Sequence, residues 1–303
     1  MESLRILVAG FVTIDTIQLP ARSIISIGGP PSYAGLTCAR FGMSVTALTK
    51  IGTDFPDDQA VWLARNGIPL SAADRSTTKR TTRFAIKVTG TDRTISLTSR
   101  CEDISPNQLQ DSQFNASLVS PIAGEISSSL LTSIARRSDF TFLDPQGFVR
   151  RFNAAGEVSV GKLQDEGILK AVEAIKMDRE EATAITGKAA PVDALAKLAA
   201  GGLRKAVVTQ GAEACFVLDG ARVFKIPVPH VQIVDTTGAG DILSGGLVAN
   251  YVRTRDFLWS ACFGIAASSL SLRMIALSKV DLPMTVDEEA RHLYSLASPT
   301  AFA

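Results

Sequence analysis

The sequence predicts an α/β fold, a doubly wound three-layer αβα sandwich with a mainly parallel sheet and a small β-sheet lid. Two observations support this prediction. Short β-branched runs alternate with helix-like stretches along most of the 303 residues, and strands joined by helices pair in parallel, with helices on both faces of the sheet. Residues 81–97 break this rhythm, because polar and apolar residues alternate there without a neighbouring helix.

The main elements are expected where the periodicity is clearest. Strands are predicted at residues 5–9, 44–51, 117–122, 140–143, 171–177, 206–209 and 215–218. Helices are predicted at residues 32–41, 56–66, 127–137, 179–186, 191–201, 239–252 and 257–271. In the first helix, Ala34, Cys38 and Phe41 are spaced at i, i+4 and i+7, which puts them on one face.

The lid is expected to comprise residues 16–27 and 81–100, inserted in a single α/β domain that spans residues 1–303. The second segment contains a hairpin that turns at residues 90–92, and the first is a shorter alternating run. The alternative is that both segments are edge strands of the main sheet. The C-terminal tail, residues 296–303, is expected to fray.

Composition excludes several classes of protein. Apolar residues make up 46% of the chain and charged residues 20%, and the net charge is +1 without a basic stripe, which argues against a nucleic-acid partner. The N-terminal apolar run, residues 6–12, is too short for a signal-peptide core or a membrane span. Four dispersed cysteines and two histidines indicate neither a disulfide framework nor structural zinc. We therefore expect a cytoplasmic protein that does not bind membranes.

The segment "VDTTGAGDILSGG", residues 234–246, is the strongest chemical signal in the chain. A dinucleotide-binding fingerprint would need glycine where Leu243 stands, and a nucleophile elbow would need glycine where Ile242 stands. A near-match to a P-loop, residues 156–163, ends in Leu163, which lacks the hydroxyl that would ligate magnesium. Neither the segment nor the near-match therefore belongs to these motif classes.

The same segment is physically suited to bind an anion. Glycines allow a sharp turn, and a helix that begins at about Ala239 would point its unpaired N–H groups into that turn. Asp241 would then lie in the first turn of the helix, where its carboxylate can accept a proton from an attacking hydroxyl. The alternative is that Asp241 only complements the helix dipole, which is worth ~0.3–1 kcal/mol.

The residues "VDTTGAGD" match the C-terminal signature of the ribokinase-type (PfkB) carbohydrate kinases. Five further segments resemble that family in the same order, so that the resemblance spans roughly residues 5–275: "VAGFVTID", "GGPPSYAGLTCARFG", "IGTDFPDD", "MDREEATAITG" and "VVTQGAEACFV". The resemblance implies a ribokinase-like fold and ATP-dependent transfer of the γ-phosphoryl group to a hydroxyl of a small sugar or polyol.

The resemblance also implies roles for individual residues. Asp241 would be the catalytic base, and the N–H groups of Gly238, Ala239 and Gly240 would form the anion hole. The acceptor would contact Asp15, Gly28, Gly29 and Tyr33, and ATP would contact Thr209, Gly211, Thr236 and Thr237. Mg²⁺ would be organised by Glu181 and, through water, by Asp178, and Asp235 would contribute to a site for a monovalent cation such as K⁺. A homodimer formed through the lid is one expectation for the assembly.

Three departures from the family pattern bear on the acceptor. Tyr33 stands where the family has a sugar-binding Asn, and this "GGPP-x-Tyr" variant resembles inositol-kinase-like members, so a cyclitol such as myo-inositol is one candidate. Asp178 also replaces an Asn. Gln146 and Phe148 replace Asn and Arg, and either Arg150 or Arg151 could supply the missing cation or be a solvated surface charge.

Other interpretations remain open on the sequence alone. A nucleoside kinase of the same family would need aromatic or amide groups to hold a base, and the lid and residues 100–125 offer Phe84 and Phe114. A non-catalytic ligand-binding relative would have lost the base or the anion turn. Glu125 could hold a hydroxyl-rich ligand or act as a helix N-terminal acid. His230 is expected to have a surface or packing role.

Overall fold

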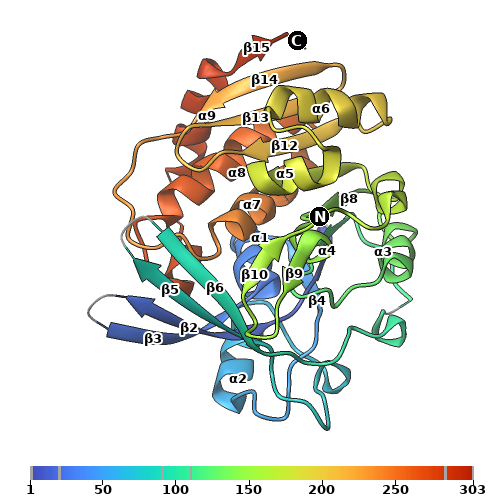
Figure 1. The fold of residues 1–303 in the computed structure, drawn as a ribbon, viewed down its shortest axis with the longest axis vertical. Helices are drawn as coiled ribbons and strands as arrows, with labels where there is room; N and C mark the ends of the chain where they lie inside the picture. Colours follow the sequence, from blue (N-terminus) through green and yellow to red (C-terminus); the bar gives the residue numbers. More distant parts are fainter. Residues whose placement is uncertain (1–2, 20–21, 90–91, 110, 283–284, 302–303) are drawn as a thin grey trace.

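The main sheet has nine strands and confirms the predicted α/β architecture. The computed structural model describes residues 3–19, 22–89, 92–109, 111–282 and 285–301 (Figure 1). In spatial order the strands are β15 (Ser298–Thr300), β14 (Arg222–Pro227), β13 (Ala214–Asp219), β12 (Lys205–Thr209), β11 (Ala174–Asp178), β8 (Thr141–Leu143), β7 (Ala116–Val119), β1 (Arg5–Ala9) and β4 (Ser44–Leu48). The six strands β4, β1, β7, β8, β11 and β12 pair in parallel with their neighbours. The pairings of β12 with β13, of β13 with β14 and of β14 with β15 are antiparallel.

The antiparallel end of the sheet corrects two sequence expectations. Strand β14 was not predicted, because its apolar residues are interrupted by exposed positions such as Lys225. The tail does not simply fray, since Ser298–Thr300 pairs with β14 in register Val223 to Thr300. Backbone pairing with an edge strand holds this segment, and a sequence pattern gives little sign of such pairing in a three-residue strand.

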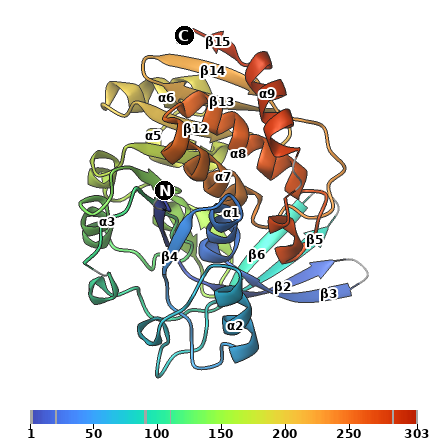
Figure 2. The same cartoon turned by 180° about the vertical axis from the view of Figure 1, so that it is seen from behind.

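Two hydrophobic cores lie on the two faces of the sheet. In β1, Ile6 and Val8 belong to one core and Leu7 and Ala9 to the other, as the two-residue periodicity of a strand requires. Helices α5 and α6 cover one face, and α7, α8 and α9 cover the opposite one (Figures 1 and 2). None of the helices in the described ranges is long and apolar enough to cross a membrane.

The helices have the following bounds. They are α1 (Leu36–Arg40), α2 (Asp57–Arg65), α3 (Ser128–Ala135), α4 (Gln146–Val149), α5 (Arg179–Thr186), α6 (Pro191–Ala200), α7 (Ala239–Thr254), α8 (Phe257–Ser271) and α9 (Val286–Leu296). Short 3₁₀ segments lie at Ala72–Asp74, Pro106–Gln108, Glu166–Lys170 and Ala276–Val280 (η5).

The predicted helix at residues 32–41 is divided in two. It begins as a wide π-type turn, η1 (Pro31–Gly35), and becomes α-helical only at Leu36. Pro30 and Pro31 lack N–H groups, and the Gly29 carbonyl accepts from both Ser32 (3.0 Å) and Tyr33 (3.1 Å). The turn packs against α7, where a Cβ on Gly245 would lie 2.6 Å from the Ala34 carbonyl oxygen.

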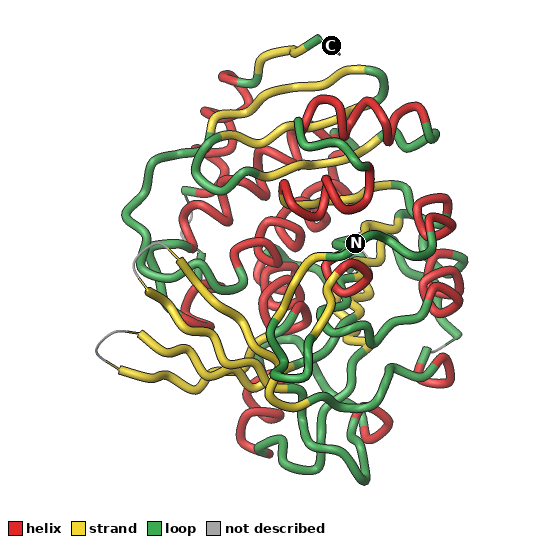
Figure 3. Tube along the Cα trace, in the orientation of Figure 1, coloured by secondary structure: helices red, strands yellow, loops and turns green. Residues whose placement is uncertain are grey.

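The lid is a separate four-stranded sheet in the order β3-β2-β5-β6. Its strands are β2 (Thr13–Leu19), β3 (Arg22–Gly28), β5 (Arg83–Thr89) and β6 (Asp92–Ser99). Figure 3 shows these strands as a group that projects to one side of the molecule. The predicted hairpin at 81–97 is confirmed, although residues 90 and 91 of its turn lie outside the described residues.

The first lid segment begins earlier than predicted. Strand β2 starts at Thr13, with three residues between it and the end of β1, so Asp15, which precedes the predicted segment, is a residue of the lid. Asp15 pairs with Ser26 of β3 and with Phe84 of β5. The edge-strand alternative for these segments is therefore wrong, because they pair with each other and not with the main sheet.

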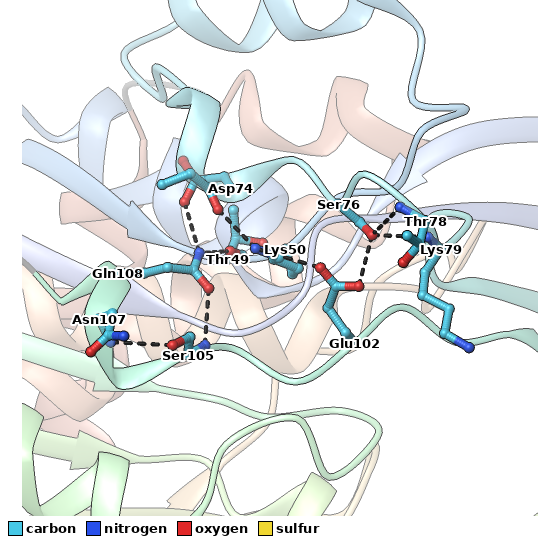
Figure 4. A network of polar contacts seen from close by, with 11 residues as sticks. Thr49, Lys50, Asp74, Ser76, Thr78, Lys79, Glu102, Ser105, Asn107 and Gln108 are labelled. Carbon is cyan, nitrogen blue, oxygen red and sulfur yellow. Dashed lines mark hydrogen bonds and ion pairs between the residues drawn. The ribbon is translucent and has the colours of Figure 1, made fainter.

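A polar network holds the base of the lid to the end of β4 (Figure 4). The Gln108 amide donates to the Thr49 carbonyl (2.8 Å) and to Asp74 Oδ1 (3.2 Å). The Ser76 hydroxyl donates to Glu102 Oε2 (2.7 Å). The chain enters the β5-β6 hairpin of the lid after residue 76 and leaves it before residue 102, so these contacts hold both ends of this hairpin near the end of β4.

Candidate active site

Two adjoining cavities lie along the carboxyl ends of the central strands, and the smaller one is also lined by the lid. The smaller, about 140 Å³, is lined by lid residues including Asp15 and Phe84 and by main-domain residues including Asp241. The larger, about 520 Å³, lies over the C-terminal half of the chain. Both cavities share four lining residues, namely Lys176, Asp178, Thr236 and Gly240. A group transferred between the cavities would therefore pass these residues.

The turn before α7 has the geometry predicted for an anion site. Gly238 has a left-handed φ of 73° and forms the N-cap of α7. A Cβ at this position would lie 2.5 Å from Cγ of Tyr33, so the Tyr33 ring also requires glycine here. The first i→i−4 bond of the helix runs from Ile242 N–H to the Gly238 carbonyl (2.9 Å). The amides before Ile242 therefore lie in the first, unpaired turn.

The structure corrects the expectation for one of these amides. The Ala239 N–H donates to the Thr236 carbonyl (3.3 Å) rather than pointing freely into the cavity. The chain reverses so tightly at Gly238 that these two groups meet. Gly238 and Gly240 are therefore the better placed of the three predicted anion-hole residues, and both line the smaller cavity.

Asp241 lies half-buried in the first turn of α7 and lines the smaller cavity. Among the described residues, its Oδ1 atom has no hydrogen-bond partner. Burial, together with the negative charge of Asp144, raises the pKa of Asp241 to about 7, although Lys176 and Arg150 act in the opposite direction. An unpaired buried carboxylate is costly to maintain, and a pKa near neutrality suits a group that gains and loses a proton.

Lys176 is a site residue that the sequence analysis did not identify. Its Nζ lies 2.9 Å from Asp144 Oδ2, and both side chains are buried. A Cβ on Gly240 would lie 2.8 Å from the same Nζ, so the absence of a side chain at Gly240 makes room for the ammonium. Burial alone would lower the pKa of Lys176, but Asp144 and Glu181 outweigh it and keep the pKa above its usual value. Its charge is therefore retained.

The predicted acceptor residues converge around the smaller cavity. Asp15, Gly29 and Tyr33 line it, and Gly28 lies beside it, where a Cβ would lie 1.9 Å from Asp15 Oδ2. Burial raises the pKa of Asp15 to about 7. Tyr33 is only 2% exposed, so its ring packs mainly against the anion turn instead of standing free in the cavity.

The two arginines near residue 150 have different roles. Arg150 lines the smaller cavity, where its charge lowers the pKa values of Asp15 and Asp241, although burial of both carboxyl groups has the larger effect. Arg151 instead donates to the carbonyls of Phe148 and Lys162. The two lie on opposite sides of β9 (Arg150–Phe152), which pairs with β10 (Val158–Val160), and this alternation separates them.

The larger cavity contains the predicted nucleotide residues. Thr209 and Gly211 line it at the end of β12, and Gly211 has a left-handed φ of 59° with open space around it. Much of the remaining wall is apolar: Val228, Val231, Ile233, Ile265 and Leu272. His230, expected to have a surface or packing role, is part of the same wall. Thr236 lines both cavities, and Thr237 lines the smaller one.

Asp178 and Glu181 form a capping box at the start of α5. Asp178 Oδ1 accepts from Glu181 N–H, and Glu181 Oε2 accepts from Asp178 N–H, both at 2.8 Å. Each acid thus has one oxygen engaged in the cap while its side chain lines the smaller cavity. Among the described residues, no three His, Cys, Asp or Glu side chains gather around a common point. The two acids fit a Mg²⁺ ion bound through water and phosphate oxygens.

Asp235 does not fit a free monovalent cation. Its Oδ1 accepts from Thr237 N–H (2.8 Å), and its Oδ2 accepts from Ala276 N–H (3.1 Å) and lies 3.2 Å from the ammonium of Lys279. Burial would raise the pKa of Asp235, but Lys279 and the two N–H groups outweigh it and hold the pKa below its usual value. The ammonium group of Lys279, in η5, therefore already pairs with this carboxylate.

Glu125 has neither of the roles proposed from the sequence. Its carboxylate accepts from the N–H groups of Phe11 (3.0 Å), Ile122 (3.0 Å) and Ala123 (2.7 Å). It is completely buried, and α3 begins later, with Ser127 as its N-cap. Glu125 therefore fixes the loop after β7 against the turn after β1, and its oxygens are occupied by the backbone.

Comparison with known proteins agrees with this geometry. The model of the pfkB family carbohydrate kinases matches residues 26–279. The chain is 26% identical over 288 residues to inositol 3-kinase of Arabidopsis thaliana, covering 92% of this chain and 77% of the relative. It is 27% identical over 263 residues to cytidine kinase of Thermococcus kodakarensis, covering 83% and 90%.

Solved structures share the fold over almost the whole chain. A pyrophosphate-dependent kinase in the ribokinase family, complexed with a pyrophosphate analog and myo-inositol, has a TM-score of 0.80 at 21% identity and covers 91% of this chain and 98% of its own. Ribokinase from Thermotoga maritima has a TM-score of 0.74 at 21% identity, covering 96% and 99%. Since the family match spans most of the sequence and the fold agrees, this chain belongs to the pfkB family of carbohydrate kinases and is a sugar, polyol or nucleoside kinase.

Proposed function

We propose that this chain transfers the γ-phosphoryl group of ATP to a hydroxyl of a small sugar or polyol, and we favour a cyclitol such as myo-inositol. The observation that carries the proposal is Asp241, which lies in the first turn of α7 beside the shared residue Gly240 and has a buried Oδ1 atom without a hydrogen-bond partner among the described residues. Similarity to inositol 3-kinase supports the choice of acceptor class.

In this mechanism the acceptor lies in the smaller cavity. The Asp15 carboxylate is suited to accept hydrogen bonds from its hydroxyls, and the Gln146 amide can both donate and accept. Arg150 offers a cation in the same cavity. Asp241 accepts the proton of the reacting hydroxyl as the oxygen bonds to the γ-phosphorus. The bond between that phosphorus and the bridging oxygen then breaks, and ADP leaves with the electron pair.

Charge at the transferred group is balanced from two sides. The N–H groups of Gly238 and Gly240 face it from the helix N-terminus, and the Lys176 ammonium faces it from β11. Thr236 and Thr237 lie beside the same turn. Asp178 and Glu181 would hold Mg²⁺ through water, and this ion would supply charge neutralisation to the donor phosphates. Catalysis of this kind consists mostly of positioning and electrostatic stabilisation.

The larger cavity supports a nucleotide as the phosphoryl donor. Its apolar wall, which includes Val228, Val231 and Ile233, is suited to an adenine ring, and Thr209 and Gly211 lie near the phosphate end. Pyrophosphate is the alternative donor, because the chain shares its fold with a pyrophosphate-dependent kinase. Pyrophosphate would leave that apolar wall unused. Comparing ATP and pyrophosphate as donors in the same assay decides between them.

A nucleoside kinase is the second candidate. The Phe84 ring and the Gln146 amide both line the smaller cavity and could hold a base, and the chain is similar to a cytidine kinase. Phe114 does not contribute, because it lines a different pocket, beside Leu7 of β1 and Val45 of β4. A non-catalytic role is disfavoured, since the predicted base and the anion turn are both in place.

A homodimer formed through the lid also remains a proposal. Ile25 of the outer lid strand β3 is 73% exposed, which leaves an apolar side chain available to a second copy. Light scattering of the purified chain gives the molecular mass directly. A monomer at all concentrations would exclude the dimer.

The test of the kinase proposal is a screen for acceptor-dependent ADP release over sugars, inositols and nucleosides. With the best acceptor, Asp241→Asn should lower kcat by about 10²–10⁴-fold, the range of a positioned base, while ATP binding persists. Asp193→Asn is the matched control, because Asp193 is likewise the third residue of a helix, α6, but lies outside both cavities.

Equal effects of the two substitutions would mean that Asp241 acts only on the helix dipole, and would overturn its role as base. Release of ADP with nucleosides alone would favour the second candidate. No release with any acceptor or donor would contradict the kinase mechanism as a whole.

A further inference from the structure

Lys279 is a completely buried lysine directly behind the anion turn. It lies in η5, and its ammonium donates to the main-chain carbonyls of Asp235 (2.5 Å) and Thr237 (2.7 Å). It also lies 3.2 Å from Asp235 Oδ2. Burying a long side chain together with its charge is costly unless the charge is compensated, so this arrangement needs an explanation.

The oxygen atoms around this ammonium form a typical cation site. Two main-chain carbonyls and a carboxylate are hard oxygen ligands of the kind that bind alkali-metal ions, and an ammonium ion is similar in size to K⁺. Here the cation is covalently part of the chain. Because both oxygens of Asp235 are already engaged by N–H groups and by Lys279, a free ion would have to displace the lysine.

The contact to Thr237 connects this cation to the site. The Thr237 carbonyl and the Gly238 N–H belong to the same peptide group, and Gly238 is the N-cap of α7 and lines the smaller cavity. An ammonium on the carbonyl side polarises that peptide and makes its N–H a stronger donor. The contact to the Asp235 carbonyl holds the chain two residues before Thr237, so the entry to the turn and its first donor are both tied to η5.

We propose that the Lys279 ammonium is a built-in cation that takes the place of a free monovalent ion behind the anion turn and makes phosphoryl transfer independent of K⁺. Lys279 is in this sense a positioning residue: it acts through the Thr237–Gly238 peptide and does not touch the acceptor or the transferred group. The proposal rests on the kinase function proposed above.

The first experiment uses the unaltered protein. Activity and thermal unfolding are compared in KCl, NH₄Cl and tetramethylammonium chloride, each at roughly 0.1 M so that electrostatic screening is matched. We expect kcat and the melting temperature to be the same in all three salts. A kcat that rises several-fold with K⁺ would overturn the proposal, because the tethered ammonium would then not fill the role.

The second experiment removes the ammonium. Lys279→Ala leaves the carbonyl cage with space for a small ion, and we expect kcat in tetramethylammonium to fall by at least about tenfold, up to the roughly 10²–10³-fold cost of losing an anion-hole donor. Adding K⁺ or NH₄⁺ should restore part of this loss and raise the melting temperature of the variant. Val280→Ala is the control, because it removes packing from the same segment and keeps the ammonium.

The control variant should lose stability without any dependence on the type of cation. Loss of activity in Lys279→Ala without rescue by either ion would mean that Lys279 has only a structural role. If Lys279→Ala does not fold, Lys279→Gln keeps the chain length and a polar end, and its melting temperature in the three salts provides the same test. Absence of turnover in the unaltered protein would contradict the kinase proposal instead, and the cation dependence of the melting temperatures would still test the site.

Discussion

At the scale of single residues, the geometry of the anion turn depends on Gly238 and on the ring of Tyr33. Gly238 needs a left-handed backbone, and it also needs to lack a Cβ because Tyr33 occupies that space. The two requirements are independent. Tyr33, one of the residues that depart from the family pattern, thus packs against the turn before α7 and also lines the smaller cavity.

Gly238→Ala should therefore be more damaging than an ordinary substitution at a left-handed glycine. Gly220→Ala is the matched control, with φ of 65° and nothing within 4 Å of its Cβ, and should cost only the ~1–2 kcal/mol of a left-handed residue. We expect Gly238→Ala to lower the free energy of unfolding by more than this and to weaken ATP binding.

Urea denaturation of Gly238→Ala, Gly220→Ala, Tyr33→Ala and the double variant Tyr33→Ala/Gly238→Ala measures the separate contributions. Removing the ring should recover the excess cost, so that the double variant is more stable than the two separate losses predict. Additive losses would show that the clash with Tyr33 is relieved elsewhere.

At the scale of elements, the lid owes its position to polar contacts at its base. Asp54 accepts from Thr81 N–H (2.7 Å), from Arg83 (2.9 Å) and from Arg80 (3.0 Å), next to the point where the chain enters β5. Burial would raise the pKa of Asp54, but these hydrogen bonds outweigh it and hold the pKa well below its usual value. The carboxylate thus remains charged and keeps β5 in place, with Phe84 directed to the acceptor cavity.

Asp54→Ala should therefore impair acceptor binding more than the chemical step. We expect KM for the acceptor to rise about tenfold, consistent with the loss of hydrogen bonds to a charged group worth ~1.5–3 kcal/mol, while kcat changes less. Steady-state kinetics measure the two constants. Asp57→Ala is the control, because Asp57 pairs with Arg75 on the surface and its side chain is 93% exposed. A fall in kcat with unchanged KM would contradict this role of the lid base.

At the scale of the whole molecule, the site is maintained at a cost in stability. Asp15 is buried and Asp241 is half-buried with a buried Oδ1 atom, and removal from water raises the pKa values of both carboxyl groups to about 7. In the unfolded chain the same groups titrate near 3.8. The folded state therefore favours the protonated acids, and their contribution to stability is present at low pH and is lost as the pH rises to about 7 and above.

Asp241→Asn should accordingly raise the melting temperature, and more so at alkaline than at acid pH. An amide has the shape of the protonated acid and carries no charge to bury, so the gain over the unaltered protein should grow from about pH 5 to about pH 8, by roughly 2–4 °C for each kcal/mol recovered. Thermal unfolding across this range measures the difference. A gain that is constant with pH would mean that Asp241 is not a raised-pKa group in the folded protein.

The sequence was sufficient for features that depend on local chemistry. Strands and helices followed from periodicity, and the turn at residues 235–241 followed from glycine next to a helix start, because both signals arise from backbone geometry within a few residues. The lid hairpin at 81–97 was recognisable for the same reason. Boundaries were wrong where pairing decides them, as in β2, which starts at Thr13, and in β15 at the tail.

The tertiary structure alone decided which charges meet. Lys176 faces Asp144 and Gly240, and Lys279 lies behind a turn 42 residues before it in the chain, on the Thr237 carbonyl. Neither lysine is part of a local sequence motif that indicates a functional role. The sequence did not distinguish Arg150 from Arg151, and only their positions in β9 show that Arg150 lines the smaller cavity while Arg151 binds main-chain carbonyls. The energy of a buried charge depends on all its neighbours in space, and the fold brings those neighbours together from distant positions in the chain.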